Sequence, residues 1–329
     1  MPKYFLGFLF LLWWPACTSA VEIGDYPELG LFIDEMLEKH NFDEEALTAL
    51  FEEAELRDDI LEIMARPGEA QPWYKYKTRF LTREHVDRGI RFWRRNRLAV
   101  DRASKQFGVP GEIVVSIIGI ETNYGRTPGR HRVIDALTTL MLKSPTRKAF
   151  FRKELENYLL LTREQKLDPL QIRGSYAGAI GLPQFMPSSY RAYAIDYDGD
   201  GTADLASSAA DAIGSVAKYF HVHDWKPGEP ISNRPQMEGD LYPWLADLGK
   251  RLVFSVHELE KYGVRPQGRR IRSDEKTSLI SFEEESSPTY RLVFHNFYVI
   301  TRYNKSPKYA LAVAELSALI RRAYNGATK

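Results

Sequence analysis

The chain has 329 residues, and its 45 Lys and Arg residues nearly balance its 44 Asp and Glu residues, so the net charge at pH 7 is +1. This balance gives no indication of a nucleic-acid partner, and a hydrophobic fraction of 44% excludes a disordered chain. The length allows two or three structural lobes. The 18 tyrosines and 6 tryptophans suit an aromatic-rich core or, alternatively, a sugar-binding cleft.

Residues 1–20 are predicted to be an export signal. Lys3 provides a short positive region, and the apolar stretch from Tyr4 to Trp14 is too short to span a membrane as a helix. Two endings remain open, namely cleavage after Ala20 and lipidation of Cys17, although a tryptophan three places before that cysteine weakens the second. Because Cys17 is the only cysteine, the mature chain can form no intramolecular disulfide. We therefore expect a periplasmic protein, with a lipid anchor in the outer membrane as the second option.

Residues 21–85 are predicted to form an N-terminal all-α lobe. Apolar residues at helical spacing between Leu29 and Leu37 indicate one helix. Asp43, followed by two glutamates, is a typical N-cap for the next helix. The Pro- and Gly-rich segment from Pro67 to Pro72 is predicted to be a linker.

Residues 86–225 are predicted to form a compact helical core. A long helix is expected from Thr82 to Phe107, and a second helix begins with Pro110 at its first helical position. The second helix is apolar on every face, which indicates a buried element. Two further helices are expected from Val133 to Leu142 and from Ala149 to Leu161.

Glu121 is the one carboxylate at the end of this apolar helix, four residues before Gly125. A helix C-terminus disfavours negative charge, and apolar neighbours disfavour ionisation. Both effects are expected to raise the pKa of Glu121, as a general acid at neutral pH requires. The alternative is that Glu121 marks the point where the helix reaches the surface, paired with Arg126 or Arg130.

The segment from Gly174 to Tyr190 is too rich in glycine and proline to form one regular helix. Ser175 and Gln184 offer hydrogen-bonding groups within it. Because long irregular segments in compact domains are often functional, we expect a cleft wall. A structural turn in a packed core is the alternative.

An Asp- and Gly-rich loop follows, and it matches the start of an EF-hand calcium loop. Oxygen-bearing side chains alternate along this loop, at Asp196, Asp198, Asp200 and Thr202. Position twelve is Ser207, which cannot act as a bidentate acid, whereas Asp211 could close an enlarged loop. A turn without metal is the alternative. The loop leads into a helix expected from Ala209 to Phe220.

Residues 226–290 are predicted to form a small β-containing lobe, and residues 291–329 a C-terminal strand and helix that return to the core. Within the small lobe we expect one short helix and two strands, at Ser255 to Tyr262, Thr277 to Phe282 and Thr289 to Phe294. Ser306 is expected to cap the last helix, with Pro307 at its first position. Tyr303 and Asn304 stand at the entrance to that helix, where side chains can reach a cleft.

Five motifs, in this order along the chain, resemble the membrane-bound lytic murein transglycosylase B family. They are E-T-N-Y-G at 121–125, G-S-Y-A-G-A-I-G-L-P-Q-F-M-P-S-S-Y at 174–190, D-x-D-G-D-G at 196–201, D-A-I-G-S-V-A-x-Y-F at 211–220 and F-Y-x-I-T-R-Y-N at 297–304. The resemblance extends from about Phe32 to the C-terminus. It implies a mainly α fold, in which a goose-lysozyme-like core carries an all-α lobe and a small β lobe.

The resemblance also implies a reaction and its residues. The reaction is non-hydrolytic cleavage of the β-1,4 bond between N-acetylmuramic acid and N-acetylglucosamine, leaving a 1,6-anhydromuramic end. Glu121 would be the single acid and base. Substrate-contacting positions would be Tyr76, Ser175, Gln184, Tyr219, Tyr303 and Asn304, and the calcium loop would include Asp211. The expected partner is a peptidoglycan glycan strand, and the expected state is a monomer.

The chemistry of such a site is consistent with one carboxylate. A protonated glutamate can give its proton to the glycosidic oxygen and then take the proton of the sugar's own 6-hydroxyl. A hydroxyl that is part of the substrate has a large effective concentration, which favours ring closure over hydrolysis.

Two other classes of protein remain open at this stage. A two-carboxylate hydrolase needs a second acid at about 5–9.5 Å from the first, and Asp135 is the nearest downstream candidate. A non-catalytic, calcium-stabilised wall-binding protein is the other. The products distinguish these classes. A transglycosylase leaves an anhydro end, a hydrolase leaves a reducing end, and a wall-binding protein releases no product.

Overall fold

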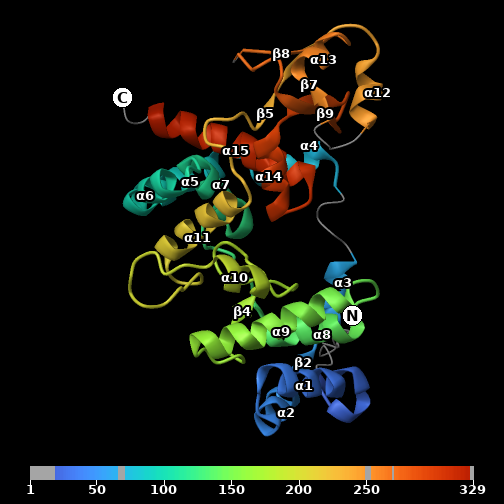
Figure 1. Cartoon of the computed structure of the whole chain (residues 1–329), viewed down its shortest axis with the longest axis vertical. Helices are drawn as coiled ribbons and strands as arrows, with labels where there is room; N and C mark the ends of the chain where they lie inside the picture. Colours follow the sequence, from blue (N-terminus) through green and yellow to red (C-terminus); the bar gives the residue numbers. More distant parts are fainter. Residues whose placement is uncertain (1–18, 66–70, 249–252, 269, 327–329) are drawn as a thin grey trace, which may run out of the picture.

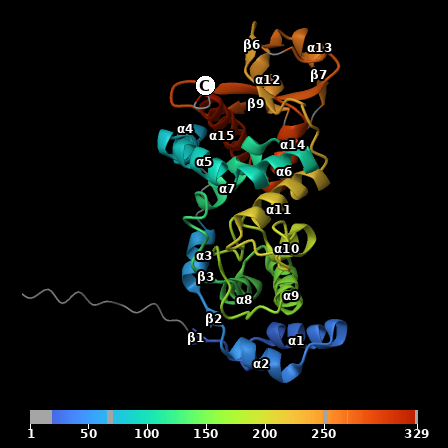
Figure 2. The ribbon, with the colours of Figure 1, turned by 90° about the vertical axis from the view of Figure 1, so that its left-hand side faces the viewer.

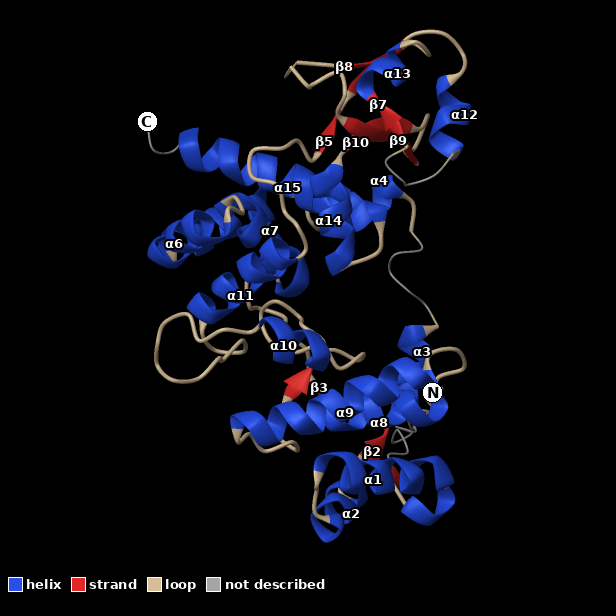
Figure 3. Cartoon of the chain, in the orientation of Figure 1, coloured by secondary structure: helices blue, strands red, loops and turns tan. Residues whose placement is uncertain are grey.

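The computed structural model describes residues 19–65, 71–248, 253–268 and 270–326. Most of the predicted export signal, including Cys17, lies outside these residues, as does most of the predicted linker. The described chain is mainly helical, and its strands are short and gathered mostly at one end (Figure 3). None of the helices in these ranges is long and apolar enough to cross a membrane.

The N-terminal segment forms one end of the elongated molecule (Figures 1 and 2). Its elements are β1 (Ser19–Ala20), η1 (Ile23–Asp25), α1 (Pro27–His40), α2 (Glu44–Glu52), β2 (Glu55–Leu56) and α3 (Asp58–Met64). The predicted cap is confirmed, because the side chain of Asp43 accepts a hydrogen bond from the backbone N–H of Ala46 at 2.8 Å. β1 and β2 pair in antiparallel fashion, with Ala20 opposite Glu55.

Two long helices adjoin this segment. The elements here are β3 (His131–Arg132), α8 (Val133–Lys143), α9 (Lys148–Gln165), β4 (Arg173–Gly174) and α10 (Pro187–Tyr193). Helix α9 packs against both α8 and α10. Both long helices were expected from the sequence, and each extends beyond its predicted range.

The middle of the molecule is a bundle around α7. Its elements are α4 (Trp73–Tyr76), η3 (Lys77–Arg79), α5 (Arg83–Arg95), α6 (Arg97–Phe107), α7 (Gly111–Thr122), α11 (Ala209–Val222), α14 (His295–Tyr303) and α15 (Pro307–Gly326). Helix α7 contacts α5, α6, α11 and α15, and Ile113, Val114, Val115, Ile117 and Ile118 are each at most 1% exposed. The prediction that this apolar helix is buried is therefore confirmed.

Two details of these helices differ from the sequence prediction. The single helix expected from Thr82 to Phe107 is two helices, which are separated at Asn96. The side-chain amide of Asn96 donates to the carbonyl of Phe92 at 2.9 Å, and such local bonds compete with helix continuation. Pro110 is the N-cap of α7 and not its first helical residue, because its ψ of 137° is extended.

The far end of the molecule is a small β lobe with its own core. Its elements are β5 (Ser232–Asn233), β6 (Pro235–Met237), α12 (Tyr242–Asp247), β7 (Phe254–Ser255), α13 (Val256–Glu260), β8 (Val264–Pro266), β9 (Lys276–Phe282) and β10 (Thr289–Val293). Four strands form an antiparallel sheet in the order β5-β10-β9-β7. The chain then returns through α14 and α15 to the bundle (Figure 2). The predicted fold, mainly α with a small β lobe, is confirmed.

Candidate active site

Glu121 occupies the last turn of α7 and is half-buried, whereas most of the preceding residues of the helix are buried. The helix ends because Asn123 adopts the left-handed conformation, with φ of 51° and its N–H bonded to the carbonyl of Gly119 at 2.9 Å. Tyr124 then folds back over Gly119, where an added Cβ would lie 2.6 Å from the tyrosine ring. Glycine at position 119 therefore permits the turn that follows Glu121.

The carboxylate of Glu121 is held by a buried phenol. The hydroxyl of Tyr309, in α15, donates to Oε1 of Glu121 at 2.6 Å. Burial and the nearby charge of Glu121 raise the pKa of Tyr309 well above its usual range, so the phenol keeps its proton and remains a donor. Arg126 and Arg130, the alternative partners considered for this carboxylate, are both exposed. The structure therefore attaches Glu121 to the interior through Tyr309.

Aromatic rings from three helices extend from this pair. The rings of Tyr303 and Tyr309 are parallel, with centroids 6.4 Å apart. Tyr219, in α11, meets Tyr303 edge to face at 4.9 Å, and its hydroxyl donates to the carbonyl of Arg302 at 2.7 Å. Burial, and after it the charge of Glu121, raises the pKa of Tyr303. The predicted residues Tyr219 and Tyr303 thus belong to one cluster beside Glu121.

Two hydrogen bonds hold the Gly-rich segment, one from the end of α7 and one from the end of α14. The hydroxyl of Thr122, the neighbour of Glu121, donates to the carbonyl of Leu182 at 2.9 Å. The hydroxyl of Tyr303 donates to the carbonyl of Pro183 at 2.5 Å. The segment is consequently fixed beside Glu121 from both sides.

Gln184 and Ser175 are both half-buried in this segment. Gln184 adopts a left-handed φ of 50°, and its amide donates to the carbonyls of Pro128 and Gly181 at 3.0 and 2.9 Å. The hydroxyl of Ser175 accepts from the backbone N–H of Ala179 at 3.0 Å. A φ of this sign is uncommon for a residue other than glycine and is often found at functional sites.

The two remaining predicted contact residues adjoin the tyrosine cluster, Asn304 next to Tyr303 in the sequence and Tyr76 near Tyr309. Asn304 follows α14 and is half-buried, with its side-chain oxygen accepting from the N–H of Ser306 at 3.0 Å. Tyr76 is 1% exposed and packs against Phe80, with ring centroids 5.3 Å apart. Tyr76 also contributes to the raised pKa of Tyr309, after the larger effects of burial and Glu121.

Asp135 is the second acid that a two-carboxylate hydrolase would need, but both of its carboxylate oxygens accept hydrogen bonds within the protein. One of its oxygens accepts from the N–H of Glu55 at 3.0 Å, and the other accepts from Arg132 at 2.7 Å. Its side chain is buried in α8, which lies next to the N-terminal segment (Figure 1). These contacts join α8 to the N-terminal segment and give Asp135 a structural role.

Three acidic residues of the Asp-rich loop can bind one metal ion. Asp196, Asp198 and Asp211 each offer an oxygen, and these oxygens lie within 4.8 Å of one another. The carboxylate of Asp211 is fully buried and accepts backbone N–H groups of Tyr197 and Asp204 at 2.6 and 2.8 Å. Asp200 and Thr202 are exposed and lie outside this group of three. A set of hard oxygen ligands on a loop of this kind suits calcium.

Comparison with known proteins decides the family. A family model described as the transglycosylase SLT domain matches residues 25–318. The membrane-bound lytic murein transglycosylase B of Escherichia coli strain K12 is 38% identical over 310 residues, which cover 90% of this chain and 84% of that protein. The chain belongs to this family of lytic transglycosylases.

Solved structures support the assignment. The Escherichia coli lytic transglycosylase Slt35 in complex with calcium is 37% identical, with a TM-score of 0.84 over 93% of this chain and 96% of that one. SltB3 from Pseudomonas aeruginosa, in complex with NAG-NAM-pentapeptide, is 29% identical, with a TM-score of 0.79 over 88% of this chain and 78% of that one. Relatives of this transglycosylase have therefore been seen with calcium and with a peptidoglycan fragment.

Sequence analysis of the transglycosylase missed Tyr309 and Thr122. Tyr309 lies three residues after Ser306 on the apolar face of the last helix, and it is 2% exposed. A phenol on a buried face needs a hydrogen-bond partner, which is the one signal that could have identified it. Thr122 gave no such signal, because its partner is a backbone carbonyl 60 residues away in the sequence.

Proposed function

We propose that the chain, a lytic transglycosylase that acts on peptidoglycan, uses Glu121 as its single acid and base. The observation that carries the proposal is the 2.6 Å hydrogen bond from Tyr309 to Glu121 at the end of a buried helix. This bond fixes one carboxyl oxygen as an acceptor. We propose that the other oxygen holds the proton that is transferred.

In the first step, Glu121 gives its proton to the oxygen of the glycosidic bond. The bond between that oxygen and C1 of the muramic acid residue breaks, and the N-acetylglucosamine side leaves with a free hydroxyl. The charge that develops at C1 is stabilised by the N-acetyl group of the substrate, as in other substrate-assisted glycosidases. General acid catalysis of this kind contributes about 10²–10⁴ to the rate.

In the second step, the Glu121 carboxylate removes the proton of the 6-hydroxyl on the same muramic acid. The 6-oxygen forms a bond to C1, which closes the 1,6-anhydro ring and returns the proton to Glu121. No water is consumed. The intramolecular hydroxyl competes well because its effective concentration can reach about 10⁵ M or more.

The remaining predicted residues are proposed to hold the glycan. Ser175, Gln184, Tyr303 and Asn304 are half-buried, and their side chains suit contacts with sugar hydroxyl and N-acetyl groups. Tyr76 and Tyr219 are at most 7% exposed. We propose that these two act from behind the site, by keeping the neighbouring rings in place.

Calcium is proposed as a structural ion in the Asp-rich loop. Asp196, Asp198 and Asp211 would hold it, with Asp200 and Thr202 as further ligands after a local adjustment of the loop. Calcium bound to these oxygens would neutralise their crowded negative charge and stabilise the native state. The proposed reaction needs no Lewis acid, so the ion would act on stability.

We further propose that the protein is a periplasmic monomer whose macromolecular partner is the glycan strand. The leader predicted from the sequence supports export, and Cys17 is the single residue that a lipid anchor in the outer membrane could use. Fractionation of cells that express wild type or Cys17→Ala tests the anchor. Equal solubility of the two proteins, both beginning at Val21, would refute it.

The reaction is tested by identifying the products of wall digestion by mass. Wild type is expected to release anhydro ends, and Glu121→Gln is expected to lose at least about 10²–10⁴-fold in turnover while still binding glycan strands. Asp135→Asn is the matched carboxylate control and is expected to retain the same products. Reducing-end products from wild type, or full activity in Glu121→Gln, would refute the mechanism.

A further inference from the structure

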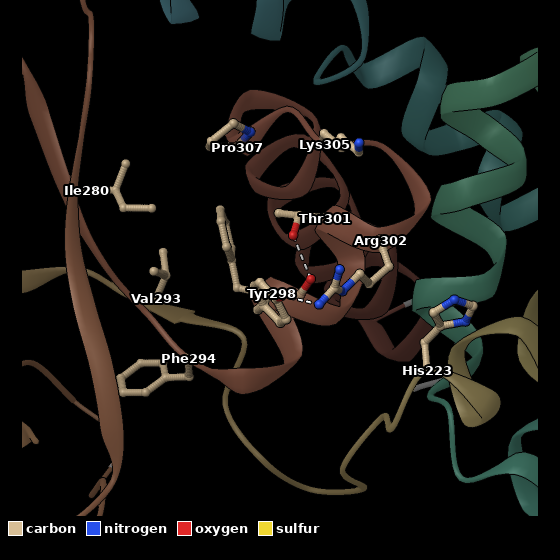
Figure 4. A pocket seen from close by; sticks show the side chains of 10 residues that line it. His223, Ile280, Val293, Phe294, Tyr298, Thr301, Arg302, Lys305 and Pro307 are labelled. Carbon is tan, nitrogen blue, oxygen red and sulfur yellow. Dashed lines mark hydrogen bonds between the residues drawn. The ribbon is translucent and has the colours of Figure 1, made fainter. Parts of the chain in front are cut away.

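A pocket of about 460 Å³ lies between the sheet of the β lobe and helix α14 (Figure 4). Ile280, Val293 and Phe294 form an apolar wall on the side of the sheet, and each is buried. The opposite side carries Arg302, with Lys305 just beyond the end of α14. The pocket therefore combines an apolar wall with a cationic one.

The cations of this pocket are available to a ligand. The guanidinium of Arg302 lies over the ring of Tyr298, 4.3 Å from its centroid, and donates to the hydroxyl of that tyrosine. Among the described residues, neither Arg302 nor Lys305 pairs with a carboxylate, and both are exposed. The residues that line the pocket include no Asp or Glu.

His223 completes the polar side of the pocket. Its Nδ1 lies 2.8 Å from the carbonyl of Tyr219, to which it donates, and its ring stacks on the Tyr219 ring at 4.1 Å. This bond fixes the orientation of the imidazole and directs Nε2 away from the Tyr219 carbonyl. His223 thus adds a polar group to the two cations, on the side of the pocket nearest the tyrosine cluster.

The pocket and the proposed glycan site share one short stretch of chain. Arg302 immediately precedes Tyr303 and Asn304, and its carbonyl accepts the hydroxyl of Tyr219. Lys305 immediately follows Asn304. The residues that line the pocket therefore flank, along the chain, the two residues proposed to contact the sugar.

We propose that this pocket binds the acidic peptide stem of the substrate, through its carboxylates. This inference rests on the proposed function, because the peptide is attached to the lactyl group of the muramic acid whose glycosidic bond is cleaved. Arg302 and Lys305 recognise the carboxylates as guanidinium and ammonium groups do elsewhere. The apolar wall of Ile280 and Val293 accommodates the small aliphatic side chains between them.

Other anions fit the pocket less well than a peptide does. A compact ion such as inorganic phosphate would use the cations and leave the apolar wall exposed to water. An anionic lipid surface is flat, whereas these residues line a concavity. A short chain that carries both carboxylates and aliphatic groups satisfies both walls.

The test compares two substrates made from one wall preparation, namely glycan strands that carry stem peptides and strands from which an amidase has removed them. Wild type is expected to prefer the peptide-bearing strands. The double variant Arg302→Gln/Lys305→Gln is expected to lose up to about tenfold in kcat/KM on those strands, the scale of two partly exposed ion pairs. On peptide-free strands its kcat/KM is expected to stay close to that of wild type.

A matched control removes the same charge elsewhere. Arg94 and Arg97 are exposed on α5 and α6, so Arg94→Gln/Arg97→Gln is expected to leave both rates unchanged. The proposal is wrong if wild type has no preference, if the pocket variant slows both substrates equally, or if the control variant lowers the peptide-dependent rate as much. Thermal unfolding of Arg302→Gln/Lys305→Gln, with the charge-preserving variant Arg302→Lys/Lys305→Arg as the reference, separates a folding defect from a loss of recognition.

A binding measurement separates this inference from the proposed mechanism. Calorimetry with NAG-NAM-pentapeptide and with the peptide-free disaccharide needs no cleavage, so its result does not depend on how the bond breaks. Wild type is expected to bind the peptide-bearing compound more tightly than the peptide-free disaccharide. The pocket variant is expected to bind the two compounds with similar affinity. Equal binding of the two compounds by wild type, or an equal benefit of the peptide in wild type and the pocket variant, would refute the peptide site.

Discussion

Replacing Tyr309 by phenylalanine tests the contact on which the proposed mechanism depends. The substitution removes one oxygen from a ring that is 2% exposed and leaves the packing of α15 unchanged. The lost bond is 2.6 Å long and has a carboxylate as its acceptor. Hydrogen bonds to charged groups are worth about 1.5–3 kcal/mol, and each 1.36 kcal/mol corresponds to tenfold in rate.

The expected result is a fall in kcat of about 10- to 150-fold. This range follows because the lost hydrogen-bond energy of about 1.5–3 kcal/mol corresponds to roughly one to two tenfold steps in rate. KM is expected to change little, because the Tyr309 hydroxyl bonds to the enzyme's own carboxyl group. Steady-state rates of release of anhydro products over a range of glycan concentrations measure both parameters. The products themselves should remain anhydro, since Glu121 is intact.

Tyr158→Phe is the matched control. Tyr158 lies in α9, and its buried hydroxyl donates to the carbonyl of Pro169 at 2.6 Å. Neither residue belongs to the candidate site at the end of α7. This variant loses a hydrogen bond of the same length and should be slightly less stable, with kcat unchanged. A Tyr309→Phe enzyme with kcat within about twofold of wild type would refute the positioning role, as would a loss confined to KM.

Two further predictions concern stability. Calcium should raise the thermal midpoint of wild type and a chelator should lower it, by a free energy of about 2.7 kcal/mol at a hundred times the dissociation constant. Asp196→Asn should lose this response, and an unchanged wild-type midpoint would count against the ion. Burial lowers the pKa of His85 to about 4, well below the value of about 6.5 for a free imidazole. Since the unfolded state binds the extra proton first, the free energy of unfolding should fall by about 1–3 kcal/mol as pH drops from 6.5 to 4. Urea unfolding at pH 7 and 4.5 should show a smaller fall in His85→Gln, and identical falls would contradict this account.

The sequence predicted most of the helices because their apolar residues recur at helical spacing. The burial of α7 followed from its composition, and the cap at Asp43 followed from local chemistry. The break at Asn96 was missed, because the pattern of apolar residues continues through it and only a side-chain bond to Phe92 interrupts the helix. Periodicity therefore locates helices well and their interruptions poorly.

The candidate site was predictable only in part. Glu121 was identified because a carboxylate in an apolar helix is unusual, and Asp196 and Asp198 because their spacing is that of a metal-binding loop. The partner of Glu121 was not identified, since Tyr309 is 188 residues away and contact between them depends on the packing of α15 on α7. The left-handed φ of Gln184 was not predicted either, because glutamine has no intrinsic preference for that conformation and adopts it here only in the folded protein.

The metal loop and the tyrosine cluster are joined by one rigid element, α11. Asp211 lies in the first turn of this helix, and Tyr219 lies eight residues later, which corresponds to about 12 Å along the axis at 1.5 Å per residue. Asp211 accepts backbone N–H groups of the loop, while Tyr219 contacts Tyr303 and the carbonyl of Arg302. A change at the metal loop would thus reach the site through the position of Tyr219. Glu121 itself is attached to α15 through the hydrogen bond from Tyr309.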